Sequence, residues 1–334
     1  MTKFLIIRFS SIGDIVLTTP VIRCLKQQTH GAEIHFLVKD QFQAVVAHNP
    51  YIDKVHVLAH SRELMIEELI AEEYDYIIDL HHNVKTLAVK RALKKASGKK
   101  LTVFSFYKLN IQKYFLTAFK INLLPRVHIV DRYMKTVESL GVRNDGKGLD
   151  YFIAENEETK RTDIPASHHA GYIACVIGAA HNTKKWPVHK WKEFCREMKH
   201  PIILLGGPED RVTGDEIAAV DTVKVYNACG KFSLNESADL VRKSKLVITH
   251  DTGLMHIAAA FKKPIISIWG NTVPAFGMTP YYGAAMVADV IMQVHKLWCR
   301  PCSKIGYSKC PLGHFKCMEK IGAGEVLQRA RQSI

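Results

Sequence analysis

The sequence predicts an α/β protein with two Rossmann-like domains, each a doubly wound parallel sheet, and three observations predict it. At 334 residues the chain exceeds the size at which one hydrophobic core usually stops growing, so two domains of about 150 residues are expected. Apolar runs of strand length alternate with helical patterns, as in βαβ units. A polar, acidic segment at residues 154–170 separates two such series. We therefore place the domains at residues 1–160 and 161–334.

The N-terminal domain alternates between strands and helices from its first residues. It is expected to contain strands at residues 4–9, 34–38, 55–58 and 76–80, and helices at residues 15–28, 41–47, 62–71 and 84–93. Residues 10–14 form a turn after the first strand. Pro20 falls inside the first helix, where a proline is tolerated only near a helix start or at a kink.

The C-terminal domain repeats this alternation. It is expected to contain strands at residues 172–177, 201–205 and 246–250, and helices at residues 188–198, 208–220 and 234–243. Small residues at 257–260 suit a helix packed closely on a sheet, Pro264 ends that helix, and another buried strand runs to Gly270. Ligands of such sheets bind outside the carboxyl ends of the strands, so two facing domains are expected to form a central cleft.

Composition limits the classes of protein to consider. The 47% apolar content suffices for two hydrophobic cores. No apolar run reaches the length of about 18 residues that marks a transmembrane helix, and the N-terminus turns polar too early for a signal peptide. We therefore expect a cytoplasmic protein. The eight cysteines are compatible with that compartment if they are reduced or bind metal.

The formal charge of +14 is concentrated in one stretch of the chain. Residues 80–130 contain no Asp or Glu, and their eleven basic residues are Lys85, Lys90, Arg91, Lys94, Lys95, Lys99, Lys100, Lys108, Lys113, Lys120 and Arg126. Aromatic residues are interleaved with the second half, namely Phe104, Phe106, Tyr107, Tyr114, Phe115 and Phe119. Such a surface fits nucleic acid, an anionic membrane face or a polyanionic lipid substrate. A basic face that is only solvated is the alternative.

The most informative segment joins the strand at 246–250 to the following helix through Asp251, Thr252 and Gly253. It offers an N-cap, a flexible residue for close backbone approach, and free N–H groups at a helix start. Such a terminus favours phosphate. His256 lies about one turn into the helix, where it could face the same ligand. An ordinary capped turn with a core histidine is the alternative.

The turn after the first strand carries a second candidate site. Gly13 lets the backbone approach a ligand, and Asp14 stands at the helix entrance. The carboxylate could simply cap the helix. It could also accept a proton from a substrate hydroxyl, a contribution of roughly 10²- to 10⁴-fold to the rate. The helix N-terminus is expected to keep Asp14 ionised.

Two more strand ends add basic and acidic groups. After Gly178, a loop carries Lys184 and Lys185, of which a lysine could balance a diphosphate without a metal ion; plain solvated charge is the alternative. In the segment LGGPED, Glu209 or Asp210 could bind ribose hydroxyls. The same pattern is also a common strand-to-helix turn.

Together these motifs resemble the heptosyltransferases of the lipopolysaccharide inner core, glycosyltransferase family 9. The resemblance rests on RFSSIGDIVLTTP at the start, KWP in the middle, LGGPED after it and HDTGLMHIAAA late in the chain, spanning Arg8 to Gly270. It implies a GT-B fold, with the acceptor on the N-terminal domain and a nucleotide sugar on the C-terminal one. The implied reaction is an inverting, metal-independent transfer of heptose from ADP-heptose to a lipopolysaccharide core acceptor of the lipid A-Kdo type.

The resemblance also implies roles for particular residues. Asp14 would be the general base. The donor site would comprise Lys184, Glu209, Asp251, Thr252, Gly253 and His256, and the acceptor site Ser10, Ser11, Gly13, Lys85 and Arg91. No cofactor is expected for catalysis, because no DxD-type carboxylate pair suited to Mg²⁺ appears at a strand end. The enzyme would act as a peripheral protein at the inner face of the cytoplasmic membrane.

Four cysteines lie close together in the C-terminal tail, at residues 299–317. Cys299, Cys302, Cys310 and Cys317, with His314 among them, could hold a structural zinc ion by thiolate ligation. A reduced or disulfide-linked surface loop competes equally with this interpretation. No catalytic role is expected for the tail.

The sequence is also compatible with two other functions. One keeps the GT-B fold with another nucleotide sugar, in a different glycosyltransferase or in an epimerase. The other is a non-enzymatic, basic nucleic-acid-binding protein. Against the latter, no RNA- or DNA-binding motif appears and the positive charge is confined to one region. The sequence leaves the acceptor, the donor sugar and base, and the oligomeric state open.

Overall fold

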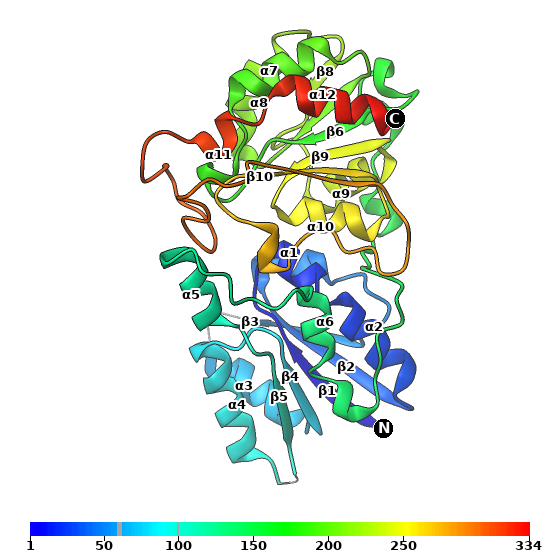
Figure 1. The fold of residues 1–334 in the computed structure, drawn as a ribbon. Helices are drawn as coiled ribbons and strands as arrows, with labels where there is room; N and C mark the ends of the chain where they lie inside the picture. Colours follow the sequence, from blue (N-terminus) through cyan, green and yellow to red (C-terminus); the bar gives the residue numbers. More distant parts are fainter. Residues whose placement is uncertain (59–61, 99) are drawn as a thin grey trace. The chain divides into compact units, whose positions relative to one another are not determined.

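The computed structural model describes residues 1–58, 62–98 and 100–334, and Figure 1 shows two parallel sheets with helices packed on them. The chain divides into two compact units. The first unit contains Met1–Lys108 and Val127–Phe152, and the second contains Leu109–Arg126 and Ile153–Ile334. The predicted α/β class with two doubly wound parallel sheets, as in the GT-B fold, is confirmed. Lys99 of the basic stretch lies outside the described residues.

The sheet of the first unit has five parallel strands in the order β3-β2-β1-β4-β5. Their bounds are β1 Thr2–Ile7, β2 Ala32–Lys39, β3 Lys54–Leu58, β4 Tyr76–Asp79 and β5 Thr102–Ser105. Ile7 at the end of β1 pairs with Leu37 on one side and Asp79 on the other. The carboxyl ends of β1 and β4 therefore lie next to each other, and the residues that follow them meet at one edge of the sheet.

Helices cover both faces of this sheet. They are α1 Ile12–Val16, α2 Thr19–Gln28, α3 Arg62–Ala71, α4 Val84–Ala96 and α6 Ile129–Met134. The single helix expected at 15–28 is divided into α1 and α2, and Pro20 stands in the first turn of α2, where a missing N–H group costs nothing. The helix expected at 41–47 is a 3-10 helix at Asp40–Val45.

The second unit has a six-stranded parallel sheet in the order β11-β10-β9-β6-β7-β8. Its strands are β6 Ile173–Val176, β7 Ile202–Leu205, β8 Val225–Asn227, β9 Leu246–His250, β10 Ile265–Trp269 and β11 Asp289–Gln293. Its helices are α5 Asn110–Ala118, α7 Val188–Glu197, α8 Arg211–Ala218, α9 Leu234–Lys243, α10 Gly253–Ala260, α11 Lys316–Glu319 and α12 Ala323–Gln332.

The C-terminal tail returns to the second sheet and completes its core. Helix α12 contacts α7, beside which it lies in Figure 1. Val326 and Ala330 of α12 are fully buried with Trp186 and Trp191, whose rings meet edge to face with their centroids 5.0 Å apart. Burial of this apolar surface is the main force that holds the tail on the sheet.

Within the part of the chain that the structure describes, none of the helices has both the length and the apolar character that crossing a bilayer requires.

Candidate active site

Arg8 organises the residues that follow β1. Its guanidinium lies 2.7 Å from Oδ1 of Asp14 and donates hydrogen bonds to the carbonyl oxygens of Ser10 (2.8 Å) and Leu80 (2.6 Å) and to the hydroxyl of Tyr133 (3.0 Å). The side chain of Arg8 is buried. A planar fork with this many fixed partners holds the carboxylate of Asp14 in one position.

The other oxygen of Asp14 is bound by Ser11. The hydroxyl of Ser11 donates to Oδ2 at 2.9 Å and its backbone N–H donates at 3.3 Å. Burial alone would raise the pKa of Asp14, but the charge of Arg8 and the hydrogen bonds from Ser11 outweigh it and hold this pKa below its ordinary value. Because 22% of the Asp14 side chain is exposed, a ligand can still reach the ionised carboxylate.

Sequence reasoning missed His81, which follows β4 at the same edge of the sheet. Its ring packs against Phe9, with centroids 5.1 Å apart, and its Nδ1 atom is buried without a hydrogen-bond partner among the described residues. Burial and the positive charges of Arg8 and Lys108 lower the pKa of His81 to about 4. A neutral imidazole with one unused nitrogen therefore lies near Asp14. The position of His81 directly after a predicted strand was the available signal.

The basic residues of α4 have different environments. Lys85 and Arg91 are exposed, which leaves them free to meet an anionic ligand. Lys90 is buried instead, lies 2.7 Å from the carboxylate of the fully buried Asp79, and donates to the Ser105 hydroxyl at 2.9 Å. Lys90 therefore neutralises a core carboxylate and does not belong to a basic surface. Its neighbours in the helix, Val89 and Leu93, mark the same buried face.

In the second unit, Lys184 and Asp251 meet at the carboxyl end of β9. The ammonium group of Lys184 donates to Oδ2 of Asp251 at 2.7 Å and to its carbonyl oxygen at 3.1 Å. The hydroxyl of Thr272, which follows β10, donates to the same Oδ2 at 2.9 Å. Thr272 had not been identified from the sequence. Both charged side chains are largely buried, so this pair is positioned by the fold.

The start of α10 is open to a ligand. Thr252 occupies the N-cap position in an extended conformation, but its side chain makes no capping hydrogen bond, and Gly253 begins the helix. The hydroxyl of Thr252 instead lies 3.2 Å from that of Thr249. The expected side-chain cap is therefore absent, because the hydroxyl of the N-cap residue Thr252 is engaged with Thr249 instead. Helix N–H groups without a capping side chain favour an anion. His256 is buried inside α10.

The glycines of the segment LGGPED pack against the buried carboxylate of Asp210. Lys185 lies 2.6 Å from Oδ1 of Asp210, and the N–H of Gly207 donates to Oδ2 at 3.0 Å. A Cβ atom at Gly178 would stand 2.3 Å from the same Oδ2. Glycine is therefore needed here for close packing on Asp210. Glu209 is exposed, and its carboxylate lies over Gly207, so of the two acidic residues only Glu209 is accessible to a ligand.

His250, at the end of β9, positions the KWP segment. Its Nε2 atom accepts a hydrogen bond from the backbone N–H of Trp186 at 2.9 Å, and the ring packs edge to face on Trp191. Burial, the largest cause, lowers the pKa of His250 to about 3, so the ring stays neutral and can accept. This contact fixes the chain directly after Lys184 and Lys185. No role for His250 was predicted from the sequence.

The four tail cysteines carry free thiols in the structure. Among the described residues, ligand atoms of three or more His, Cys, Asp or Glu lie within 4.8 Å of one another at a single place, which is not the tail. The sulfur of Cys299 lies 3.8 Å from Nε2 of His314, and Cys317 is buried in the core. Arg300 anchors the tail by donating to the carbonyl oxygens of Gly270 and Thr272, among others. As folded, the tail does not present a closed tetrahedral thiolate site.

Comparisons with known proteins agree with this arrangement. A family model described as glycosyltransferase family 9 (heptosyltransferase) matches residues 62–311. The lipopolysaccharide heptosyltransferase 1 of Campylobacter coli is 25% identical over 312 residues, which covers 86% of this chain and 87% of that protein.

Solved structures show the same fold. A glycosyltransferase of family 9 from Veillonella parvula superimposes with a TM-score of 0.76 at 21% identity, over 99% of this chain and 97% of that one. The E. coli heptosyltransferase WaaC, solved with ADP, gives a TM-score of 0.71 at 23% identity over the full length of both chains. Because the family model covers most of the sequence, the chain belongs to glycosyltransferase family 9, the heptosyltransferase family.

Proposed function

We propose that this glycosyltransferase moves heptose from ADP-heptose to a lipopolysaccharide core acceptor of the lipid A-Kdo type, with inversion and without a metal ion. The observation that carries the proposal is the ionised, partly exposed carboxylate of Asp14, which Arg8 and Ser11 hold at the carboxyl end of β1. The first unit would bind the acceptor and the second the donor. The acceptor hydroxyl would attack the anomeric carbon, pass its proton to Asp14 and displace ADP.

Asp14 has the free capacity that a general base needs. A carboxylate offers about four acceptor positions, and three are used by Arg8, the Ser11 hydroxyl and the Ser11 N–H. One position is left for a substrate hydroxyl. The low pKa makes Asp14 a weak base that is always in its basic form. Ser10 and Gly13 border the same turn, and neutral His81 adds a hydrogen-bonding group on the acceptor side.

The donor diphosphate would be held by the second unit. The uncapped N–H groups at Gly253 and the ammonium of Lys184 supply the positive partial and full charges that a departing ADP requires. Asp251 and Thr252 would position this pair of features, with Asp251 pairing with Lys184 until the diphosphate arrives. Exposed Glu209 would accept hydrogen bonds from the ribose hydroxyls, and buried His256 would support the helix start.

Basic surfaces would bind the acceptor and the membrane. Exposed Lys85 and Arg91 on α4 would contact acidic groups of the core acceptor. Around α5 the exposed large apolar residues are Ile111, Tyr114, Phe119, Ile121 and Leu123, next to exposed Lys120 and Arg126. Apolar and basic side chains together are typical of a segment that lies in the interface of an anionic bilayer. We assign the enzyme to the inner face of the cytoplasmic membrane on this basis.

Replacing Asp14 by Asn tests the catalytic role. Asn keeps the shape but cannot take a proton, so we expect transfer to fall by roughly 10²- to 10⁴-fold while ADP affinity is unchanged. Transfer is measured with ADP-heptose and purified acceptor, and affinity by thermal shift with ADP, UDP and GDP. Unchanged turnover would remove Asp14 from the mechanism. Stabilisation by UDP alone would instead favour an enzyme that uses another nucleotide sugar.

Vesicle binding tests the membrane surface. We expect the double variant Ile111→Ser with Phe119→Ser to bind anionic phospholipid vesicles more weakly, by about 0.8 kcal/mol per CH₂-sized group no longer buried. The free energy of unfolding is expected to change by less than about 0.5 kcal/mol, because both side chains are exposed. The matched control is Val212→Ser on α8, which is 80% exposed. An equal loss in the control, or preference for duplex DNA over vesicles at physiological salt, would contradict this assignment.

The C-terminal tail either binds a structural zinc ion through its cysteines or folds without an ion. The described geometry, with one buried cysteine and Arg300 anchoring the loop, supports a structural role that needs no ion. Metal analysis of the purified protein decides between the two. One equivalent of zinc that is released when the thiols are modified would show that the tail cysteines bind zinc.

A further inference from the structure

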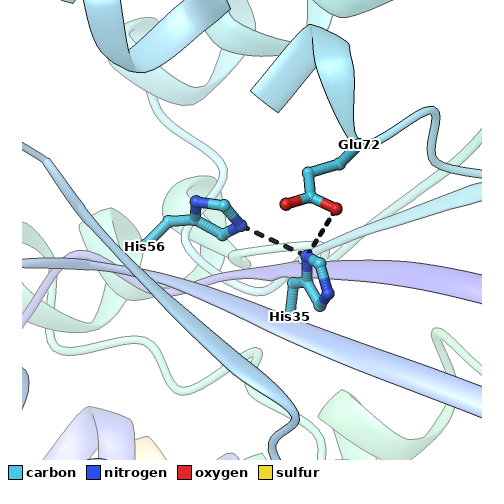
Figure 2. Close-up of side chains that lie close together, drawn as sticks. All are labelled: His35, His56 and Glu72. Atoms are coloured by element: carbon cyan, nitrogen blue, oxygen red, sulfur yellow. Dashed lines mark hydrogen bonds and ion pairs between the residues drawn. The ribbon is translucent and has the colours of Figure 1, made fainter. Parts of the chain in front are cut away.

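A second cluster of titratable side chains lies in the first unit, away from Asp14. His35 lies in β2 and His56 in β3, while Glu72 and Tyr74 lie between α3 and β4. Figure 2 shows the two imidazole rings and the Glu72 carboxylate turned toward one another. Glu72 and Tyr74 precede β4, at the amino ends of the parallel strands, whereas Asp14 follows the carboxyl end of β1. The cluster therefore takes no part in the proposed transfer.

The sheet register places the two histidines on one face. His35 pairs with Lys54, and His56 follows Lys54 by two residues. Since side chains alternate along a strand, His35, Lys54 and His56 all point to the same side. Both imidazole rings are almost completely buried, and so is Tyr74. The fold thus holds them together in a dry environment before any ligand arrives.

The distances between the polar atoms are those of a metal site. Nε2 of His56 lies 3.2 Å from Nδ1 of His35, and Nδ1 of His35 lies 3.8 Å from Oε2 of Glu72. All three ligand atoms lie within 4.8 Å of one another. Ligand atoms bound to zinc at about 2.0–2.1 Å in a tetrahedron are about 3.3 Å apart. Small side-chain movements therefore suffice to close the three around one ion.

The hydrogen-bond partner behind His35 also suits a metal ion. Nε2 of His35 lies 2.9 Å from Oε1 of Glu33, and since a carboxylate accepts, this nitrogen donates and Nδ1 is the atom that faces His56 and Glu72. A carboxylate behind a ligating histidine is the usual arrangement in metal sites.

Glu72 supplies the negative charge. Its carboxylate accepts hydrogen bonds from the ammonium groups of Lys54 and Lys3. The two lysine side chains are 54% and 29% exposed, so either can turn to solvent and free a carboxylate oxygen. The Tyr74 hydroxyl lies 2.9 Å from Nδ1 of His35 and 3.0 Å from Nε2 of His56. A metal ion between the two histidines would displace this hydroxyl from both nitrogens.

We propose that His35, His56 and Glu72 form a binding site for one divalent transition-metal ion of the zinc type. Two imidazole nitrogens and one carboxylate oxygen are a donor set that zinc accepts, with a fourth position for water. The ion joins β2 and β3 to the chain between α3 and β4. Its role is structural, because the cluster is remote from Asp14.

Metal binding by the full chain, without a polyhistidine tag, tests the site directly. Co²⁺ serves as the optical probe and Zn²⁺ as its competitor, after dialysis against a chelator. We expect one equivalent with the visible absorption of tetrahedral nitrogen and oxygen ligation, distinct from the intense charge-transfer bands of thiolate-bound Co²⁺ in the tail. His56→Gln should weaken this binding by at least about tenfold, and so should Glu72→Gln. The matched control, His30→Gln, replaces an exposed histidine and should bind like the unmodified chain.

Two further measurements keep the test valid if a ligand variant fails to fold. Zn²⁺ should raise the melting temperature of the unmodified chain by mass action. Tyr74→Phe keeps the packing but removes only the competing hydroxyl, so it should bind Zn²⁺ equally or more tightly. The proposal is overturned if Zn²⁺ leaves the melting temperature unchanged, if only thiolate-type spectra appear, or if Tyr74→Phe abolishes binding.

Discussion

Two strand-end ion pairs, Arg8–Asp14 in the first unit and Lys184–Asp251 in the second, contain the same charges but are built differently. Arg8 reaches four groups in separate parts of the chain, including the carbonyl of Leu80 and the hydroxyl of Tyr133. The ammonium of Lys184 donates to two groups, and both belong to Asp251. A guanidinium with many fixed partners holds its carboxylate still, whereas an ammonium on a flexible stem can move from Asp251 to a phosphate.

This difference matches the roles proposed for the two units. A general base must be held in one geometry relative to the attacking hydroxyl, because misplacement costs rate. A phosphate-binding cation has to meet a ligand that arrives and leaves. The rigid pair is therefore expected to affect stability and chemistry together, and the mobile pair to affect mainly binding.

The largest effect is expected from Arg8→Met. It leaves a partly buried Asp14 without its cation, so the free energy of unfolding of the first unit should fall by about 3 kcal/mol, the low end for broken buried pairs because Asp14 is partly exposed. Urea unfolding followed by far-UV circular dichroism measures this loss. All four tryptophans, Trp186, Trp191, Trp269 and Trp298, lie in the second unit, so their fluorescence should report an unchanged transition.

Arg8→Lys is the matched control for that experiment. Lysine keeps the charge but lacks the fork, so it should restore part of the stability and little of the transfer activity. Equal stability and activity for the Lys variant and the unmodified chain would show that the fixed guanidinium geometry is unnecessary. The contrast between the two ion pairs would then disappear.

A smaller effect, mainly on ADP binding, is expected from Lys184→Met, because the Thr272 hydroxyl still donates to Asp251. Loss of a charged hydrogen-bond donor to the diphosphate should weaken ADP binding by about 1.5–3 kcal/mol, roughly 10- to 100-fold. Calorimetric titration with ADP measures it. The neighbouring Lys185→Met is the control: Lys185 pairs with buried Asp210, so its loss should lower stability more than ADP affinity. The reverse pattern would transfer the phosphate role from Lys184 to Lys185.

Central strands of both sheets could be predicted from the sequence, and most edge strands could not. β1, β4, β6, β7, β9 and β10 have neighbours on both sides and read as apolar runs. The missed strands β5, β8 and β11 are the outermost strands of their sheets. β11, with alternating exposed positions, and the three-residue β8 bury too little side-chain surface to give a clear apolar pattern. β3 is also an edge strand, but its alternation of valine and polar residues was sufficient.

The residues of the candidate site also divide into those that the sequence could predict and those that it could not. Asp14, Lys184 and Asp251 could be named as candidates from the sequence because each stands next to a recognisable strand end or helix start. Arg8 and Thr272 could not, because their roles depend on partners distant in sequence, such as Tyr133, which is 125 residues from Arg8. Lys90 was grouped with the surface lysines in the sequence-based prediction, because its partner Asp79 lies on a different element. Charge patterns locate a basic stretch but do not distinguish exposed from paired members.

The smallest effect is expected from pH, and it tests the rigid pair most directly. The pKa of Asp14 in the folded protein lies below its ordinary value of 3.8. Its ion pair therefore stabilises the fold at neutral pH, and this contribution is lost as the pH falls below 3.8 through the folded-state pKa. Since the pKa of His81 is also low, about 4, neither group changes charge between pH 5 and 8. The kcat/KM of transfer should thus show no acidic limb from Asp14 in that interval. A limb that disappears in Asp14→Asn would mean that Arg8 does not hold the carboxylate ionised.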